Sequence, residues 1–186
     1  MQIARLEELT SNQLHEAAHI LVVALQHVPS ARHDIRSAMA EVSTFVHNPD
    51  RAGLAAINNS EILGWIGVIR HSGSAWELHP LVVRPERQRQ GYGRRLVSAL
   101  EDKARQDGVC TIWLGTDDDF GGTNLFGCDL YPDVLVKLQQ LRPRAGHPYV
   151  FYERLGYAVA GVLPDVDGIG KHDILMAKRI SPRRPA

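Results

Sequence analysis

The sequence of 186 residues has few cysteines and no long apolar segment, and both absences limit what the protein can be. Its two cysteines, Cys110 and Cys128, are too few for a disulfide framework and do not form a CxxC motif. No apolar run approaches the roughly 18–20 residues that span a bilayer. The N-terminus lacks a basic region followed by an apolar core. We therefore expect a cytoplasmic protein with reduced thiols and no membrane partner.

The sequence also has no excess of charge, because 21 Lys and Arg balance 21 Asp and Glu. A neutral total disfavours nucleic acid as a partner, which usually requires a strongly basic surface. The charges are nevertheless segregated along the chain. Residues 84–95 hold five arginines and one glutamate, whereas residues 106–136 hold six aspartates and no basic residue. The first segment would suit an anionic ligand and the second a cationic one.

Hydrophobic periodicity and turn residues predict a single α/β domain with a mixed sheet over residues 1–180, followed by a tail at 181–186. The spacing of apolar residues predicts helices at 11–25, 31–46, 91–108, 132–141 and 148–156. Strands are predicted at 2–7, 53–58, 61–70, 75–83, 110–116, 157–164 and 173–180. Ser11 is the expected N-cap of the first helix and Gly108 the expected C-cap of the third.

The segment His15 to His19 fits the HExxH pattern of zinc proteases on a predicted helix. Two histidines four residues apart share a helix face and can bind zinc, but a catalytic zinc needs a third protein ligand. No third ligand follows in a recognisable pattern, and matches of five residues occur by chance. We therefore predict no metal site.

The predicted strand 75–83 carries two polar residues, Glu77 and His79, in an apolar run. Strict alternation would place both on one face together with Leu81 and Val83. Pro80 cannot donate a ladder hydrogen bond, which indicates a bulge or a splayed edge. A histidine in a strand is most often a core residue. A glutamate is rarely buried without a partner, so Glu77 is the stronger candidate for a functional residue.

A basic loop and two glycines, Gly91 and Gly93, follow this strand and open the third predicted helix. Unpaired N–H groups at a helix start bind anions, and glycines let phosphate oxygens approach the backbone. The spacing alone leaves two interpretations open, a pyrophosphate cradle or a helix start with a solvated basic face. The segment is neither a P-loop nor a GxGxxG dinucleotide turn.

The segment Gln88 to Gly93, QRQGYG, resembles the Q/RxxGxG/A signature of the GNAT acetyltransferase superfamily. The blocks WELHPLVV, LGTDD, DLYPD, HPYVFYERLGY, GVLPD and DILMAK are similar to one branch, the aminoglycoside 6′-N-acetyltransferases that use acetyl-CoA. These blocks run in the expected order from Trp76 to Lys178. The resemblance implies a single-domain GNAT fold, in which a central, mostly antiparallel sheet has a splayed strand pair and flanking helices.

The resemblance also implies a role for each matching residue. Glu77 would be the base or the anchor for the acceptor amine, with His79 beside it, and Tyr152 would protonate the leaving thiolate of coenzyme A. The backbone groups that would bind acetyl-CoA are those of Leu81, Val82 and Val83 for the pantetheine arm and of Gln88, Arg89, Gln90, Gly91, Tyr92, Gly93 and Arg94 for the pyrophosphate. Many superfamily members have glycine where Arg89 stands, and this departure is unexplained by the sequence.

The aspartates point to the class of acceptor. An aminoglycoside is a polycation that clustered carboxylates attract and orient, and Asp117, Asp118 and Asp173 are the candidates to bind it. A solvated loop or a turn-capping run is the alternative interpretation. The resembling branch suggests a homodimer. Transfer to another polyamine or to a protein amine, and binding of coenzyme A or an aminoglycoside without turnover, stay open as alternatives.

Overall fold

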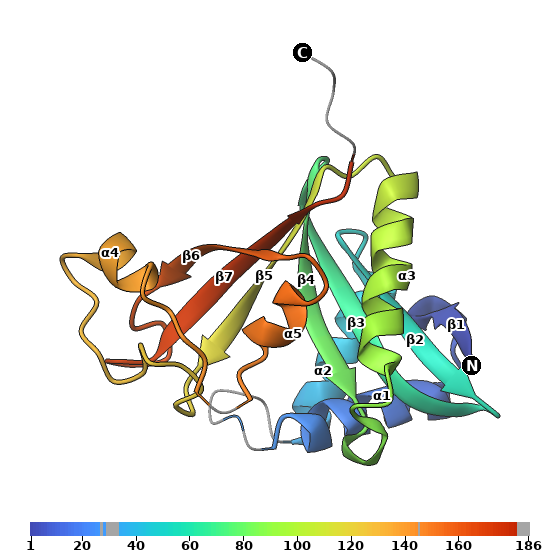
Figure 1. Cartoon of the computed structure of the whole chain (residues 1–186). Helices are drawn as coiled ribbons and strands as arrows, with labels where there is room; N and C mark the ends of the chain where they lie inside the picture. Colours follow the sequence, from blue (N-terminus) through green and yellow to red (C-terminus); the bar gives the residue numbers. More distant parts are fainter. Residues whose placement is uncertain (27, 29–33, 145, 182–186) are drawn as a thin grey trace. The chain divides into compact units, whose positions relative to one another are not determined.

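The computed structural model describes residues 1–26, 28, 34–144 and 146–181, which form two compact units (Figure 1). The first unit holds the described residues up to Ile112, except Val28, together with those from Arg179 onward. The second holds Val28 and the described residues from Trp113 to Lys178. No helix in these described ranges is both long and apolar enough to cross a bilayer. The predicted tail lies outside the described residues from 182 onward, and a single domain over 1–180 stays a prediction.

Four antiparallel strands form the sheet of the first unit, in the order β1-β2-β3-β4. Their bounds are β1 Gln2–Arg5, β2 Arg51–Asn58, β3 Glu61–Ser72 and β4 Ala75–Val83. Asn59 and Ser60 join β2 to β3 with φ angles of 47° and 69°. Two successive positive φ angles give a hairpin turn whose twist matches that of the strands. The strands predicted at 53–58 and 61–70 are confirmed, and this turn joins them into a hairpin.

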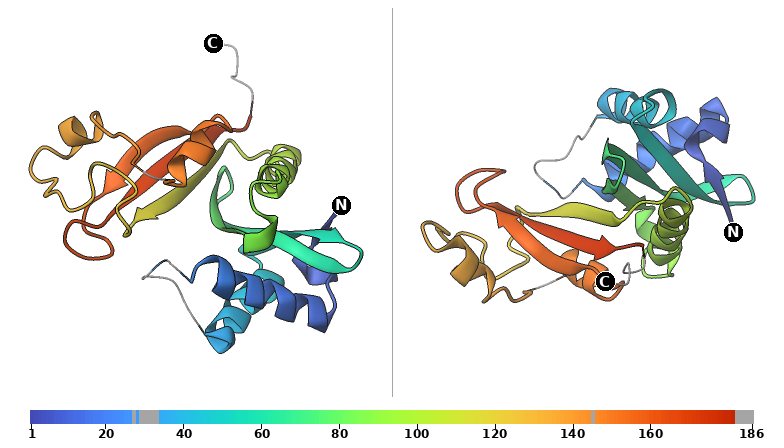
Figure 2. Two further views of the ribbon diagram at one scale, coloured as in Figure 1. Left: turned by 60° about the horizontal axis from the view of Figure 1, so that its bottom comes forward. Right: turned by 90° about the horizontal axis from the view of Figure 1, so that it is seen from above.

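Three helices and two short 3₁₀ turns cover this sheet, α1 and α2 on one face and α3 on the other (Figure 2). Their bounds are η1 Leu6–Glu8, α1 Ser11–Ala24, α2 Ile35–His47, η2 Pro85–Arg87 and α3 Tyr92–Gln106. Trp65 anchors the core under α1 and α2. Its indole N–H donates to the Ala17 carbonyl at 3.0 Å, and its ring meets Phe45 edge-on at 5.5 Å.

The ends of these helices correct one prediction and support another. The N-cap of α1 is Thr10 rather than Ser11, because Thr10 and Gln13 form a reciprocal capping box that satisfies two backbone N–H groups. Gly108 follows the end of α3 with φ +74°, the left-handed conformation that commonly ends a helix. The predicted start of α2 at residues 31–33 lies outside the described residues.

The second unit contains strands in the order β5-β7-β6, of which β6 and β7 are antiparallel. The bounds are β5 Thr111–Asp118, α4 Val134–Leu138, α5 Tyr149–Glu153, β6 Ala158–Leu163 and β7 His172–Arg179. The α4 helix is shorter than predicted because Gln140 and Leu141 donate to carbonyls three residues back, which tightens the chain into turns. Strands and helices occur in the predicted order, and the mixed α/β fold class is confirmed.

Candidate active site

The β4 strand contains a bulge where Pro80 predicted one. Leu78 pairs with Val68 and Leu81 pairs with Ile66, so the His79–Pro80 dipeptide stands opposite a single residue of β3. The extra residue interrupts the ladder and bends the strand. The predicted bulge is therefore confirmed.

The bulge overturns the prediction that Glu77 shares a face with Leu81 and Val83. Glu77 pairs with Ile69 and Leu81 pairs with Ile66. Ile69 and Ile66 are three residues apart on β3, so their side chains point to opposite faces of the sheet. Paired residues of neighbouring strands share a face, so Glu77 and Leu81 also point to opposite faces. The residue inserted at the bulge shifts the alternation of all later residues of β4, so strict alternation fails beyond Pro80.

Glu77 has a hydrogen-bond partner that the sequence did not indicate. Its side chain is 21% exposed, and its Oε2 lies 2.5 Å from Nε2 of the half-exposed His71. His79 lies nearby on β4, and its Nε2 is 3.8 Å from a carboxylate oxygen of Glu41 on α2. Arg51 binds the same Glu41 oxygen at 3.2 Å. Glu77 thus contacts a basic side chain, and His79 lies near an acidic one, both within the first unit.

The loop after β4 has the backbone features expected of an anion cradle. Gly91 is the N-cap of α3 with φ +87°, and the space where a side chain would start is open. Arg89 also has a positive φ of 59°. Only glycine adopts this conformation without a steric cost, which accounts for the glycine that other members of the resembling family carry there. The Gln88 N–H donates to the Pro85 carbonyl at 3.3 Å, and residues 88–91 after it are exposed. An exposed helix start of this kind can bind an anion.

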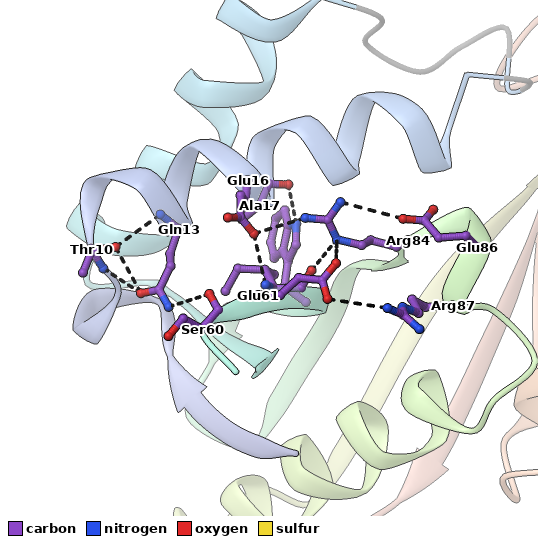
Figure 3. Close-up of polar contacts among 11 residues, drawn as sticks. Thr10, Gln13, Glu16, Ala17, Ser60, Glu61, Arg84, Glu86 and Arg87 are labelled. Atoms are coloured by element: carbon purple, nitrogen blue, oxygen red, sulfur yellow. Dashed lines mark hydrogen bonds and ion pairs between the residues drawn. The ribbon is translucent and has the colours of Figure 1, made fainter. Parts of the chain in front are cut away.

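Two of the five arginines around this loop, Arg84 and Arg87, form ion pairs with glutamates of the first unit (Figure 3). Arg84 Nε donates to the Ile62 carbonyl at 2.5 Å, and its NH2 donates to Glu16 at 3.1 Å. Glu61 lies 3.6 Å from both Arg84 and Arg87. Three arginines, Arg89, Arg94 and Arg95, are exposed around the glycines.

Glu16 also accepts a hydrogen bond from the Ile62 N–H at 3.1 Å. The central glutamate of the HExxH match therefore ties α1 to the start of β3. Its partners in the match, His15 and His19, are exposed on the helix.

In the second unit, Asp117 lies at the end of β5 among other carboxylates. Burial and the nearby Asp173, Asp167 and Asp119 raise the pKa of Asp117 to about 6. Asp173 on β7 lies over Gly115, where a Cβ atom would come within 2.2 Å of its carboxylate. Asp167, which the sequence analysis did not single out, belongs to this group through the loop between β6 and β7.

Asp118 differs from its neighbour Asp117, although both were candidates for substrate binding. Asp118 is fully buried, and its carboxylate accepts hydrogen bonds from the Gly122 N–H, the Thr123 N–H and the Thr123 hydroxyl at 2.6, 3.0 and 2.5 Å. This arrangement holds the loop after β5 and favours a structural role for Asp118. Its signal in the sequence is the alternation of β5, which turns adjacent residues to opposite faces.

Tyr152 lies on α5, and its side chain is almost fully buried. Its ring meets Phe151 and Tyr157 edge-on at 5.1 and 5.7 Å. Burial raises the pKa of Tyr152, because an apolar environment disfavours the phenolate. The hydroxyl therefore keeps its proton at neutral pH and can act as a donor.

His147 is a second buried titratable group in this unit. Its Nδ1 accepts the Tyr149 N–H at 3.2 Å, and its ring stacks on Phe120 with centroids 5.6 Å apart. Burial lowers the pKa of His147 by disfavouring the imidazolium. Cys110 and Cys128 are both exposed, and neither forms a disulfide.

Comparisons with known proteins agree with this arrangement. A model of the "Acetyltransferase (GNAT) family" matches residues 16–126. A search of curated proteins gave no match. Among the solved structures that resemble the chain, three aminoglycoside acetyltransferases are similar over nearly its whole length. A coenzyme A complex of an aminoglycoside 6′-N-acetyltransferase is 38% identical with a TM-score of 0.89, and both chains are covered completely.

A second structure, the aminoglycoside 6′-N-acetyltransferase from Enterococcus faecium, is 37% identical with a TM-score of 0.87, again with complete coverage of both chains. A third, an aminoglycoside 6′-acetyltransferase of type Ii, is 34% identical with a TM-score of 0.73 and covers 99% of this chain and 100% of its own.

Proposed function

Since the chain belongs to the GNAT acetyltransferase family, we propose that it transfers acetyl from acetyl-CoA to the 6′-amino group of an aminoglycoside and so confers resistance. The observation that carries this proposal is the full-length similarity, at 37–38% identity, to two aminoglycoside 6′-N-acetyltransferases. The branch-specific blocks from Trp76 to Lys178 support the same substrate class.

Acetyl-CoA supplies the acetyl thioester, and the first unit carries the residues proposed to bind it. The backbone N–H groups from Gln88 to Arg94 bind the pyrophosphate, and the backbone of Leu81 to Val83 pairs with the pantetheine arm. The open position at Gly91 and the left-handed backbone at Arg89 support this assignment. The exposed side chains of Arg89 and Arg94 attract the phosphates over longer distances.

Glu77 is proposed as the base for the acceptor amine. An aminoglycoside amine arrives as an ammonium group, and it must lose a proton before its lone pair can attack a carbonyl carbon. A carboxylate accepts that proton directly or through one water. His79 lies on the same strand and helps to orient the acceptor.

Tyr152 is proposed as the acid that protonates the departing thiolate. Its buried hydroxyl retains its proton, which supports this role. Direct transfer forms the amide bond as the thioester bond breaks, and the proton from Tyr152 completes the thiol. No protein nucleophile is required.

Asp117 and Asp173 are proposed to bind further ammonium groups of the substrate. Burial and the neighbouring carboxylates raise the pKa of Asp117, and a bound cation relieves the repulsion between these charges. Asp118 is left out of this set because its carboxylate is buried and engaged with Gly122 and Thr123.

The test is an acceptor screen that follows thiol release from acetyl-CoA with kanamycin-type aminoglycosides, with spermidine and with lysine peptides. We expect turnover with aminoglycosides only. Release with spermidine or with peptides, but with no aminoglycoside, would show that the acceptor is another polyamine or a protein amine. Saturable binding of an aminoglycoside without release would identify a binding protein. The variant Glu77→Gln should lower kcat by about 100-fold and leave the KM for acetyl-CoA within about twofold.

Two further properties belong to the same proposal. A homodimer is proposed from the resemblance of the sequence to its branch, and size-exclusion chromatography with light scattering tests it. Use of acetyl-CoA favours action in the cytoplasm, which fractionation of cells that express the protein would check.

A further inference from the structure

The hydrogen bond between His71 and Glu77 has no part in the proposal above. It joins the end of β3 to the start of β4 within the first unit, with Nε2 of His71 2.5 Å from Oε2 of Glu77. A carboxylate can only accept, so the Nε2–H group donates. The contact engages one of the two carboxylate oxygens, and a hydrogen bond to an ionised group is among the stronger kinds.

A local irregularity in β3 brings the imidazole to this carboxylate. The register of β3 against β4 shifts between Arg70 and Ser72, so His71 is the inserted residue of a bulge. A bulge changes the direction of the side chain at the inserted position. Glu77 is a diagonal neighbour across the strands, a separation that a long side chain spans.

The two partners differ in their access to water. The His71 side chain is 52% exposed, whereas the Glu77 side chain is 21% exposed. The imidazole therefore lies at the solvent edge and exchanges protons with water, and the carboxylate lies farther in. The imidazole therefore contacts the carboxylate from the side that faces the solvent.

We propose that His71 is a positioning residue for acetyl transfer: its Nε2–H fixes Oε2 of Glu77 and so presents Oε1 to the acceptor amine. The assignment rests on the proposed role of Glu77 as base. His71 itself does not touch the reacting atoms. Its contribution is to reduce the rotamers of Glu77 to one before the substrate binds, which removes an ordering cost from the transition state.

The test compares His71→Ala, His71→Gln and, as a matched control, His15→Ala, which removes an exposed histidine of α1. We expect His71→Ala to lower kcat roughly tenfold with an unchanged KM for acetyl-CoA. The glutamine amide can donate in place of Nε2, so His71→Gln should recover most of the rate. Wild-type turnover in His71→Ala, or equal losses in both variants, would overturn the proposal.

A measurement without substrate separates this inference from the proposed function. The tautomer of the His71 imidazole is followed through its ring ¹⁵N chemical shifts in the wild-type protein and in Glu77→Ala. The hydrogen bond to the carboxylate should hold the Nε2–H tautomer in the wild-type protein, and this preference should weaken in Glu77→Ala. An unchanged ratio of tautomers would overturn the pairing. Full turnover by Glu77→Gln would instead refute the base, and with it any role of His71 through that base.

Discussion

The two units handle charge in opposite ways. In the first, Arg84 is surrounded by the carboxylates of Glu16, Glu61 and Glu86, and the opposite charges satisfy one another. In the second, Asp117 is surrounded by carboxylates, and its pKa rises to about 6. Paired charges serve the fold, whereas gathered like charges cost stability until a cation binds.

The contrast teaches how to separate structural charges from functional ones in a single chain. The five arginines looked alike in the sequence, but Arg84 and Arg87 have carboxylate partners. Adjacent aspartates looked alike too, but Asp118 is engaged by three hydrogen bonds and Asp117 faces other acids. Three of the charges assigned to ligands have other surroundings, since Arg89 and Arg94 are exposed and Asp117 lies among carboxylates.

The largest expected effect comes from removing Asp118, the acid of the second unit whose carboxylate is fully hydrogen-bonded. Asp118→Ala leaves the N–H groups of Gly122 and Thr123 without their acceptor in a buried loop. We expect the free energy of unfolding to fall by about 3 kcal/mol and Tm by roughly 10 °C. Asp129→Ala, which removes an exposed carboxylate bonded to one N–H, serves as the control and should cost below about 1 kcal/mol. Equal losses in the two variants would contradict the structural role of Asp118.

The next effect sharpens the contrast from the side of the first unit. Arg84→Met keeps most of the apolar stem but leaves Glu16 and Glu61 without their shared cation. We expect a loss of about 2 kcal/mol, because the guanidinium is largely buried and donates to the Ile62 carbonyl as well. The KM for acetyl-CoA should rise, since Arg84 directly precedes the η2 turn in the loop that we propose binds the pyrophosphate. Chemical denaturation measures the first effect, and Arg36→Met, at an exposed position on α2, is the control.

A smaller effect tests whether the gathered acids serve the substrate. Asp117→Asn removes one carboxylate and keeps the shape of the side chain. We expect the KM for an aminoglycoside to rise roughly tenfold, which equals about 1.4 kcal/mol, with an unchanged KM for acetyl-CoA. Asp129→Asn provides the matched control. If both KM values rose together, a general disturbance of the protein would be the better explanation.

The smallest effect is a dependence of stability on pH. The folded pKa of Asp117, about 6, lies above its ordinary value of 3.8, so the folded state binds the proton more tightly than the unfolded chain. This contribution to stability is complete below about pH 4 and is lost as the pH rises through about 6. Denaturant midpoints at pH 5 and 7.5, without ligand, should therefore fall less in Asp117→Asn than in the wild-type protein. A saturating aminoglycoside should reduce the wild-type decline.

Local signals in the sequence predicted much of the fold. The hairpin at Asn59, the stripe of α3 and the helix end at Gly108 each depend on neighbouring residues, so a pattern along the chain contains them. Pro80 likewise predicted the bulge in β4. The change of sheet face at Leu81 was not predicted, because the face of a residue after a bulge depends on its pairing with the neighbouring strand.

The candidate site was harder to predict where it depends on contacts between distant segments. His71 meets Glu77 only because β3 carries an inserted residue, and no local signal marks that insertion. Asp118 and Asp117 have the same side chain, and the loop at 122–123 decides which of them is buried. The backbone at Arg89 explains why the family motif often has glycine at this position. Its φ of +59° is a conformation that glycine adopts without a steric cost.

Gly115 ties two positions of the chain together. The Asp173 carboxylate occupies the volume in which any side chain at position 115 would begin, at 2.2 Å from the missing Cβ atom. Among natural or selected variants, an alanine or larger residue at 115 should therefore appear together with a change at 173, and the two positions should covary.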